Sequence, residues 1–170
     1  MKYLKKYNVF KEAVLDISTT DMPDIKMGKQ SLENIGKQLS EYNSKKGLID
    51  NIYKNYKDPV EIERELVKIL GDQQVKDGPD RNTFLVDYLH LAKLKSDLDN
   101  FEKQRKNYDE ELKLATDSAA KQSVNQKIQE LVKKVNDTNT KLTFDKKAHD
   151  DKMSKTKKEL DINISKLSNV

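Results

Sequence analysis

This 170-residue chain contains no cysteine, only five glycines and three prolines, and no long apolar run. Without cysteine it can form neither a disulfide framework nor a thiolate metal site. No apolar stretch approaches the roughly 18 residues that a membrane-spanning helix needs, so the sequence predicts no membrane span. Glycine and proline are the residues that most often interrupt helices, so their scarcity favours long helices.

The composition is also poor in residues that build a core. Hydrophobic residues make up 35% of the chain and charged residues 36%. Such a balance suits long helices with a narrow apolar stripe, because most of their circumference faces water. Only three of the basic residues are arginines, and the net charge is +4. Arginine is the usual bidentate reader of phosphates and guanines, so we expect any nucleic-acid binding to be weak and non-specific.

The first part of the chain contains two helical patterns separated by a break. Residues 1–17 place apolar side chains at steps of three and four, which predicts an amphipathic helix. The sequence "STTDMPD" ends this pattern, and we expect a linker to about Gly28. The same rhythm returns over residues 30–57 and predicts a second helix. Packing within a helical bundle is the favoured role for the first helix, and a membrane-surface helix is the alternative.

A third helix is predicted by the segment "KDPVEIERELVKILGD". Asp58 is a good capping residue, Pro59 fits the first helical position, and Gly71 is placed to end the helix in a left-handed turn. The turn-rich sequence "GDQQVKDGPDRN" follows and marks a boundary between two domains, at residues 1–78 and 79–170.

Beyond Pro79 the chain contains neither glycine nor proline, and a heptad pattern covers most of this region. Arg105 is the one charged residue in the first half of the seam. The apolar phase shifts at "ATDSAAKQS", where Asp117 or Ser118 could cap a new helix. We therefore predict an antiparallel coiled-coil hairpin with arms at about 83–115 and 119–168, with a single continuous helix as the alternative.

No pattern in the sequence predicts a reactive centre. Glycine-rich phosphate loops are absent. Of the two histidines, His90 lies beside the seam, where we expect a flanking role rather than a base. Asp145 and His149 share one helical face at a spacing that suits a metal, but two ligands do not make a site. We expect no enzyme activity, no cofactor and no metal.

The opening sequence "MKYLKKYNVFKEAV" resembles the short leaders of many proteins of large tailed bacteriophages. The matching positions are Met1, Lys2, Tyr3, Leu4, Phe10 and Glu12. In some of these phages the leader implies delivery into the assembling head, with cleavage after the glutamate by the prohead protease. The Lys- and Asn-rich, cysteine-free composition is similar to that of phages with AT-rich genomes. The resemblance implies a virion protein, found in the particle or in the host cytoplasm during assembly.

Together these features predict an all-α protein with a small N-terminal helical cluster and a long antiparallel coiled-coil hairpin. We expect a structural or assembly protein that contacts other protein chains, either virion proteins or further copies of itself. A DNA-associated cargo or packing protein of the capsid interior and a phage inhibitor of a host protein are the alternatives. The predicted interaction residues are the stripe of the first helix and the hairpin seam: Tyr3, Leu4, Tyr7, Phe10, Val14, Leu91, Leu94, Leu98, Phe101, Leu112, Val124, Ile128, Leu131, Val135 and Leu142.

Overall fold

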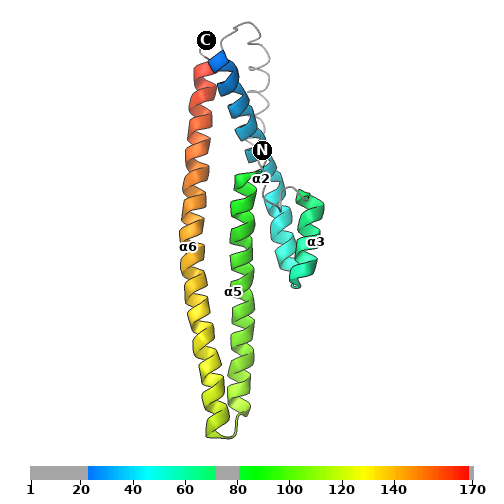
Figure 1. Cartoon of the computed structure of the whole chain (residues 1–170), viewed down its shortest axis with the longest axis vertical. Coiled ribbons are helices and arrows are strands. Elements are labelled where there is room, and N and C mark those ends of the chain that lie inside the picture. Colours follow the sequence, from blue (N-terminus) through cyan, green and yellow to red (C-terminus); the bar gives the residue numbers. More distant parts are fainter. Residues whose placement is uncertain (1–22, 72–80, 169–170) are drawn as a thin grey trace. The chain divides into compact units, whose positions relative to one another are not determined.

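The computed structural model describes residues 23–71 and 81–168, and within these ranges every regular element is a helix. The helices are α2 (Pro23–Asn55), α3 (Pro59–Leu70), α5 (Thr83–Leu114) and α6 (Ser118–Ser168), as Figure 1 shows. They confirm the predicted all-α fold. The predicted helix at residues 1–17 and the predicted domain boundary at residues 78 and 79 lie outside the described residues.

Helix α2 begins at Pro23, so the prediction of a linker as far as Gly28 is wrong. Proline is well placed in a first helical turn, because its missing N–H has no partner there in any case. The helix continues through Gly28, Gly36 and Gly47 as far as Asn55. Each interior glycine costs the helix roughly 1 kcal/mol relative to alanine, which a long helix packed against other elements tolerates.

Helix α3 begins and ends where its sequence predicts. The Asp58 carboxylate accepts a hydrogen bond from the Val60 N–H at 3.0 Å, with Pro59 as the first helical residue. At the other end, the Gly71 N–H donates to the Val67 carbonyl at 2.7 Å. Gly71 has a φ of +72°, which favours glycine, although its ψ of 165° lies outside the left-handed helical region.

The chain divides into two compact units, and α5 and α6 each contribute to both. The first unit runs through Val86 and resumes at His149. In it α3 packs against α2, and the described core combines apolar side chains from both helices with the beginning of α5 and part of α6. The buried apolar residues of this unit are Leu39, Tyr42, Ile49, Ile52, Ile62, Leu66, Leu70, Phe84, Leu85 and Met153.

Asn82 links two helices within the first unit. Its side chain is 1% exposed, and its Oδ1 accepts hydrogen bonds from the N–H groups of Phe84 and Leu85, at 3.2 and 3.3 Å. These bonds cap the N-terminus of α5. The Nδ2 of the same side chain donates to the Gln38 carbonyl at 2.9 Å and to the Glu41 carboxylate at 3.1 Å, both on α2. One amide therefore starts α5 and attaches it to α2.

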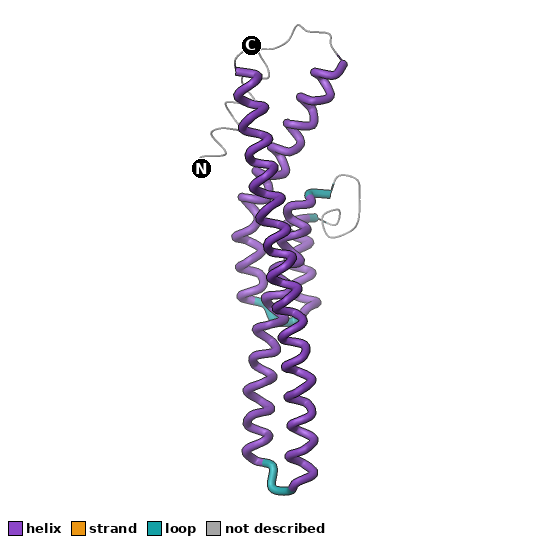
Figure 2. Tube along the Cα trace, turned by 90° about the vertical axis from the view of Figure 1, so that its left-hand side faces the viewer, coloured by secondary structure: helices purple, strands orange, loops and turns teal. Residues whose placement is uncertain are grey.

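The second unit, residues 87–148, is an antiparallel helical hairpin built from α5 and α6. Its arms lie side by side in both Figure 1 and Figure 2. A short turn joins Leu114 to Ser118, and the Asp117 carboxylate caps α6 by accepting from the Ala120 N–H at 2.6 Å. The hairpin prediction is thus confirmed and the continuous helix is excluded. Each arm begins and ends within one residue of its predicted bounds.

Candidate functional site

A groove of about 360 Å³ lies between the two arms of the hairpin, within the second unit. Its lining is mostly apolar, and its polar members lie on α5 and at one position of α6. We call it the Val132 groove, after the α6 side chain that is 39% exposed beside it. Its lining residues are Leu98, Asp99, Phe101, Glu102, Arg105, Leu131, Val132, Val135 and Asn139.

The groove lies next to Arg105, the residue that interrupts the predicted seam. A leucine at this heptad position would pack against the facing arm. The Arg105 side chain is instead partly exposed and donates to the Asp109 carboxylate at 3.1 Å, one turn further along α5. The positive charge is kept near water and paired, because burying it alone would be costly. Arg105 therefore contributes to the lining of the groove together with Leu131.

Heptad geometry places the groove on one flank of the seam. Seam residues alternate between the a and d positions of the heptad. The residue four positions after an a residue lies on one flank, and the residue immediately before an a residue lies on the other. Glu102 follows Leu98 by four positions, and Val132 and Asn139 stand in the same relation to seam residues of α6. All three line the groove. We call this side the open flank.

Complementary charges line the opposite side, which we call the charged flank. Its residues directly precede seam residues: His90, Asp97 and Glu111 on α5, and Lys127, Lys134 and Lys141 on α6. Lys127 contacts Glu111 at 3.3 Å, and its ammonium lies 5.5 Å from the centre of the Tyr108 ring.

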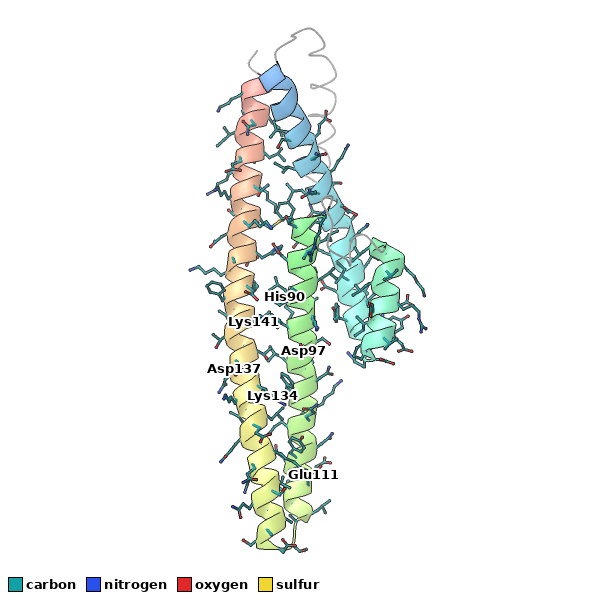
Figure 3. The ribbon with its side chains drawn as sticks, in the orientation of Figure 1. His90, Asp97, Glu111, Lys134, Asp137 and Lys141 are labelled. Atoms are coloured by element: carbon teal, nitrogen blue, oxygen red, sulfur yellow. The ribbon has the colours of Figure 1, made fainter. Side chains whose placement is uncertain are left out.

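The Lys127–Glu111 pair fixes the register of the charged flank. One heptad further along each arm, that register places Lys134 opposite Gln104, and a second heptad places Lys141 opposite Asp97. Figure 3 shows Asp97 and Glu111 on α5, with Lys134 and Lys141 on the facing helix. Glu111 and Asp97 on α5 therefore lie opposite lysines of α6, whereas Lys134 lies opposite Gln104, and an ion pair on this flank joins Lys127 to Glu111. The open flank has no such matched series, since Glu102 and Val132 occupy equivalent positions there.

The two histidines have different partners. His90 contacts the Asp145 carboxylate at 2.8 Å in the second unit. His149 is buried in the first unit, where its Nε2 lies 3.2 Å from the Tyr42 hydroxyl. Within residues 23–71 and 81–168, no group of three or more potential ligands from His, Asp and Glu is placed to hold a metal ion. Asp145, which shares a helical face with His149 in the sequence pattern, contacts His90 in the structure.

Two pKa shifts occur in the first unit. Burial works to raise the pKa of Glu41, but hydrogen bonds from Lys45 and Asn82 outweigh it and hold that pKa below its usual value. Burial raises the pKa of Tyr42, and the negative charges of Asp150 and Asp50 raise it further. Glu41 is half-buried and Tyr42 is buried, and neither group lines the groove.

The predicted interaction residues fall into three groups. The stripe of Tyr3, Leu4, Tyr7, Phe10 and Val14 lies outside the described residues. Of the seam residues, Leu91, Leu94, Val124 and Leu131 are buried, and Leu98, Phe101, Leu112, Ile128, Val135 and Leu142 are half-buried. The structure brings Leu98, Phe101, Leu131 and Val135 together in the Val132 groove.

Sequence reasoning did not predict Val132, Asn139 or Phe144 as surface features. Val132 and Asn139 lie beside the seam and line the groove, whereas Phe144 lies outside the seam and is 73% exposed. The signal that identifies Val132 is its position four residues after Ile128, where a coiled coil usually carries a charged side chain. For Phe144 the signal is a large aromatic residue off the apolar stripe.

Comparisons with models of protein families, with curated proteins and with solved structures found no match to this chain. In the part of the chain that the structure describes, no helix combines the length and the apolar character that crossing a bilayer requires.

Proposed function

We infer that this chain is a non-enzymatic structural or assembly protein that acts by binding other protein chains through its helical hairpin. The observation that carries this proposal is the Val132 groove, an apolar surface left open on one flank of an otherwise well-matched coiled coil. When a partner side chain displaces water from such a groove, the burial of apolar surface favours binding by about 25 cal/mol per Å². Concave apolar surfaces with a few polar residues at their rim are typical of binding sites.

We further propose that the assembly is the particle of a tailed bacteriophage. This part of the proposal is supported by the resemblance of residues 1–14 to phage leader sequences, and by the cysteine-free, lysine- and asparagine-rich composition. The chain would then be located in the virion, or in the host cytoplasm during assembly. Its partners would be virion proteins or further copies of itself.

Quantitative mass spectrometry of purified particles of the encoding phage tests this proposal. A fixed copy number of the chain per particle is the expected result. A phage carrying Val132→Lys should package at least severalfold fewer copies, because the lysine places a charge in the groove. A phage carrying Val60→Ser is the matched control, since Val60 is an exposed apolar residue of α3 and not of the groove.

Absence of the chain from purified particles would contradict the virion assignment. Affinity purification from infected cells then distinguishes the alternatives. Recovery of one host protein in fixed stoichiometry would indicate an inhibitor of that protein. DNA binding that weakens steeply between low and high salt would indicate a cargo or packing protein.

A further inference from the structure

Phe144 is the most exposed aromatic side chain among the described large hydrophobic residues, at 73%. It lies in the middle of α6, within the hairpin unit, and is not near a helix end. A phenylalanine side chain carries a large apolar area, which is unfavourable to leave in water. The hairpin therefore presents an apolar protrusion as well as the Val132 groove.

The protrusion and the groove lie on different faces of the hairpin. Phe144 follows the seam residue Leu142 by two positions, which places it on the outer surface of α6 toward the charged flank. The groove lies on the open flank. A two-fold symmetric dimer joins the same surface patch of both copies, so it cannot use two features that lie on different faces. A head-to-tail contact joins the protrusion of one copy to the groove of the next.

The charges around the two features are complementary. Lys147 lies three residues after Phe144 and therefore on the same face of α6, whereas Lys141, three residues before it, lies opposite Asp97 of its own hairpin. The α5 side of the groove carries Asp99 and Glu102. The remaining charge of the lining, Arg105, is already paired with Asp109 at 3.1 Å.

We propose that Phe144 of one copy inserts into the Val132 groove of a second copy, with Lys147 next to Asp99 and Glu102 of that copy. Each copy then has one protrusion and one groove in use, and the contact repeats along an open chain of copies. This inference deepens the proposed function, because it identifies the partner of the same groove as the chain itself. The open chain is a form of assembly that a structural protein can use.

Analytical ultracentrifugation of the full chain tests the proposal. A single inserted side chain gives a small and therefore weak interface, so concentrations up to about 1 mM are needed. We expect the sedimentation coefficient of the wild-type chain to rise with concentration, and to rise less as salt is added. Phe144→Ser and Val132→Lys should each weaken association by roughly tenfold or more. Leu114→Ser is the matched control, because Leu114 is 80% exposed at the hairpin turn and should associate like the wild type.

Mixing the two variants gives the decisive result. The Phe144→Ser chain keeps its groove and the Val132→Lys chain keeps its phenylalanine, so an equimolar mixture should form one-to-one pairs that do not extend. If Val132→Lys loses helicity in circular dichroism, Glu102→Lys takes its place in the mixture. Association that survives Phe144→Ser, or a mixture that remains monomeric, refutes the proposed contact.

A wild-type chain that is monomeric at every concentration would also refute it. That result would leave the proposed function standing, because particle composition tests the latter separately. The groove partner would then be a different protein.

Discussion

Replacing Asn82 should reveal two separable contributions of one buried amide. Asn82→Ala removes the cap of α5, which is worth about 1 kcal/mol. It also removes a hydrogen bond to the Gln38 carbonyl, worth about 1 kcal/mol, and a charge-assisted one to Glu41, worth about 2 kcal/mol. Because Asn82 is 1% exposed, water cannot readily replace these bonds. We expect a loss of about 2–4 kcal/mol in the free energy of unfolding.

Asn82→Asp separates the two contributions. The aspartate keeps the oxygen that accepts from the Phe84 and Leu85 N–H groups, so the cap of α5 survives. The new oxygen cannot donate to the Gln38 carbonyl. The aspartate also places a second carboxylate next to that of Glu41, because the Asn82 Nδ2 atom that it replaces lies 3.1 Å from a Glu41 carboxylate oxygen. Like charges at such a distance repel strongly where solvent is excluded. At pH 7 this variant should therefore be at least as unstable as Asn82→Ala, although aspartate is a good capping residue.

Urea denaturation followed by circular dichroism measures these changes, and Asp58→Asn is the matched control. Asp58 caps α3 at an exposed position, where asparagine and aspartate perform about equally, so we expect a change of less than about 0.5 kcal/mol. Adding Glu41→Gln to Asn82→Asp should recover more than about 1 kcal/mol of the free energy of unfolding. The glutamine removes the repulsion between the two carboxylates, and its amide can donate a hydrogen bond to the carboxylate introduced at position 82.

The opposite ranking would refute this reasoning. If Asn82→Asp is as stable as the wild type, the donation to α2 contributes nothing and the residue acts as a cap alone. If Asn82→Ala changes stability by less than about 0.5 kcal/mol, neither contribution is as large as the buried geometry implies.

Three further predictions concern the glycines, the titratable cluster and the seam. Gly47→Ala should stabilise the chain by up to about 1 kcal/mol, because a Cβ there meets nothing within 4 Å, whereas Gly71→Ala should destabilise it by about 1 kcal/mol because φ is +72°. Thermal melts of the two variants, shifted in opposite directions, check this pair. The lowered pKa of Glu41 contributes stability that is present above its ordinary value near 4.5 and is lost as the pH falls through the lower folded value. The raised pKa of Tyr42 contributes stability that is present below about pH 10 and is lost above it, so urea midpoints should fall at both extremes and Tyr42→Phe should flatten the alkaline limb. Arg105→Leu should restore an apolar seam residue beside Leu131 and raise the melting temperature of the hairpin; an unchanged melt would show that the seam tolerates arginine at no cost.

Local sequence signals determined most of the secondary structure. The Asp58–Pro59 start, the glycine at position 71 and the absence of glycine and proline beyond residue 79 act through bonds within one or two turns, so they are legible without the fold. The heptad pattern and the phase shift near Asp117 likewise predicted two arms and their turn. The beginning of α2 was misjudged because residues between Pro23 and Gly28 resemble a linker in composition, although proline also suits a first helical turn.

Only the tertiary structure decided which surfaces are matched and which are open. The sequence identified Leu98, Phe101, Leu131 and Val135 as seam residues, but only the packing of the two arms places them together with Val132 around one groove. The double role of Asn82 depends on groups more than forty positions away in the chain. Such contacts are set by how helices pack, and a one-dimensional pattern does not contain the distance between two residues on different helices.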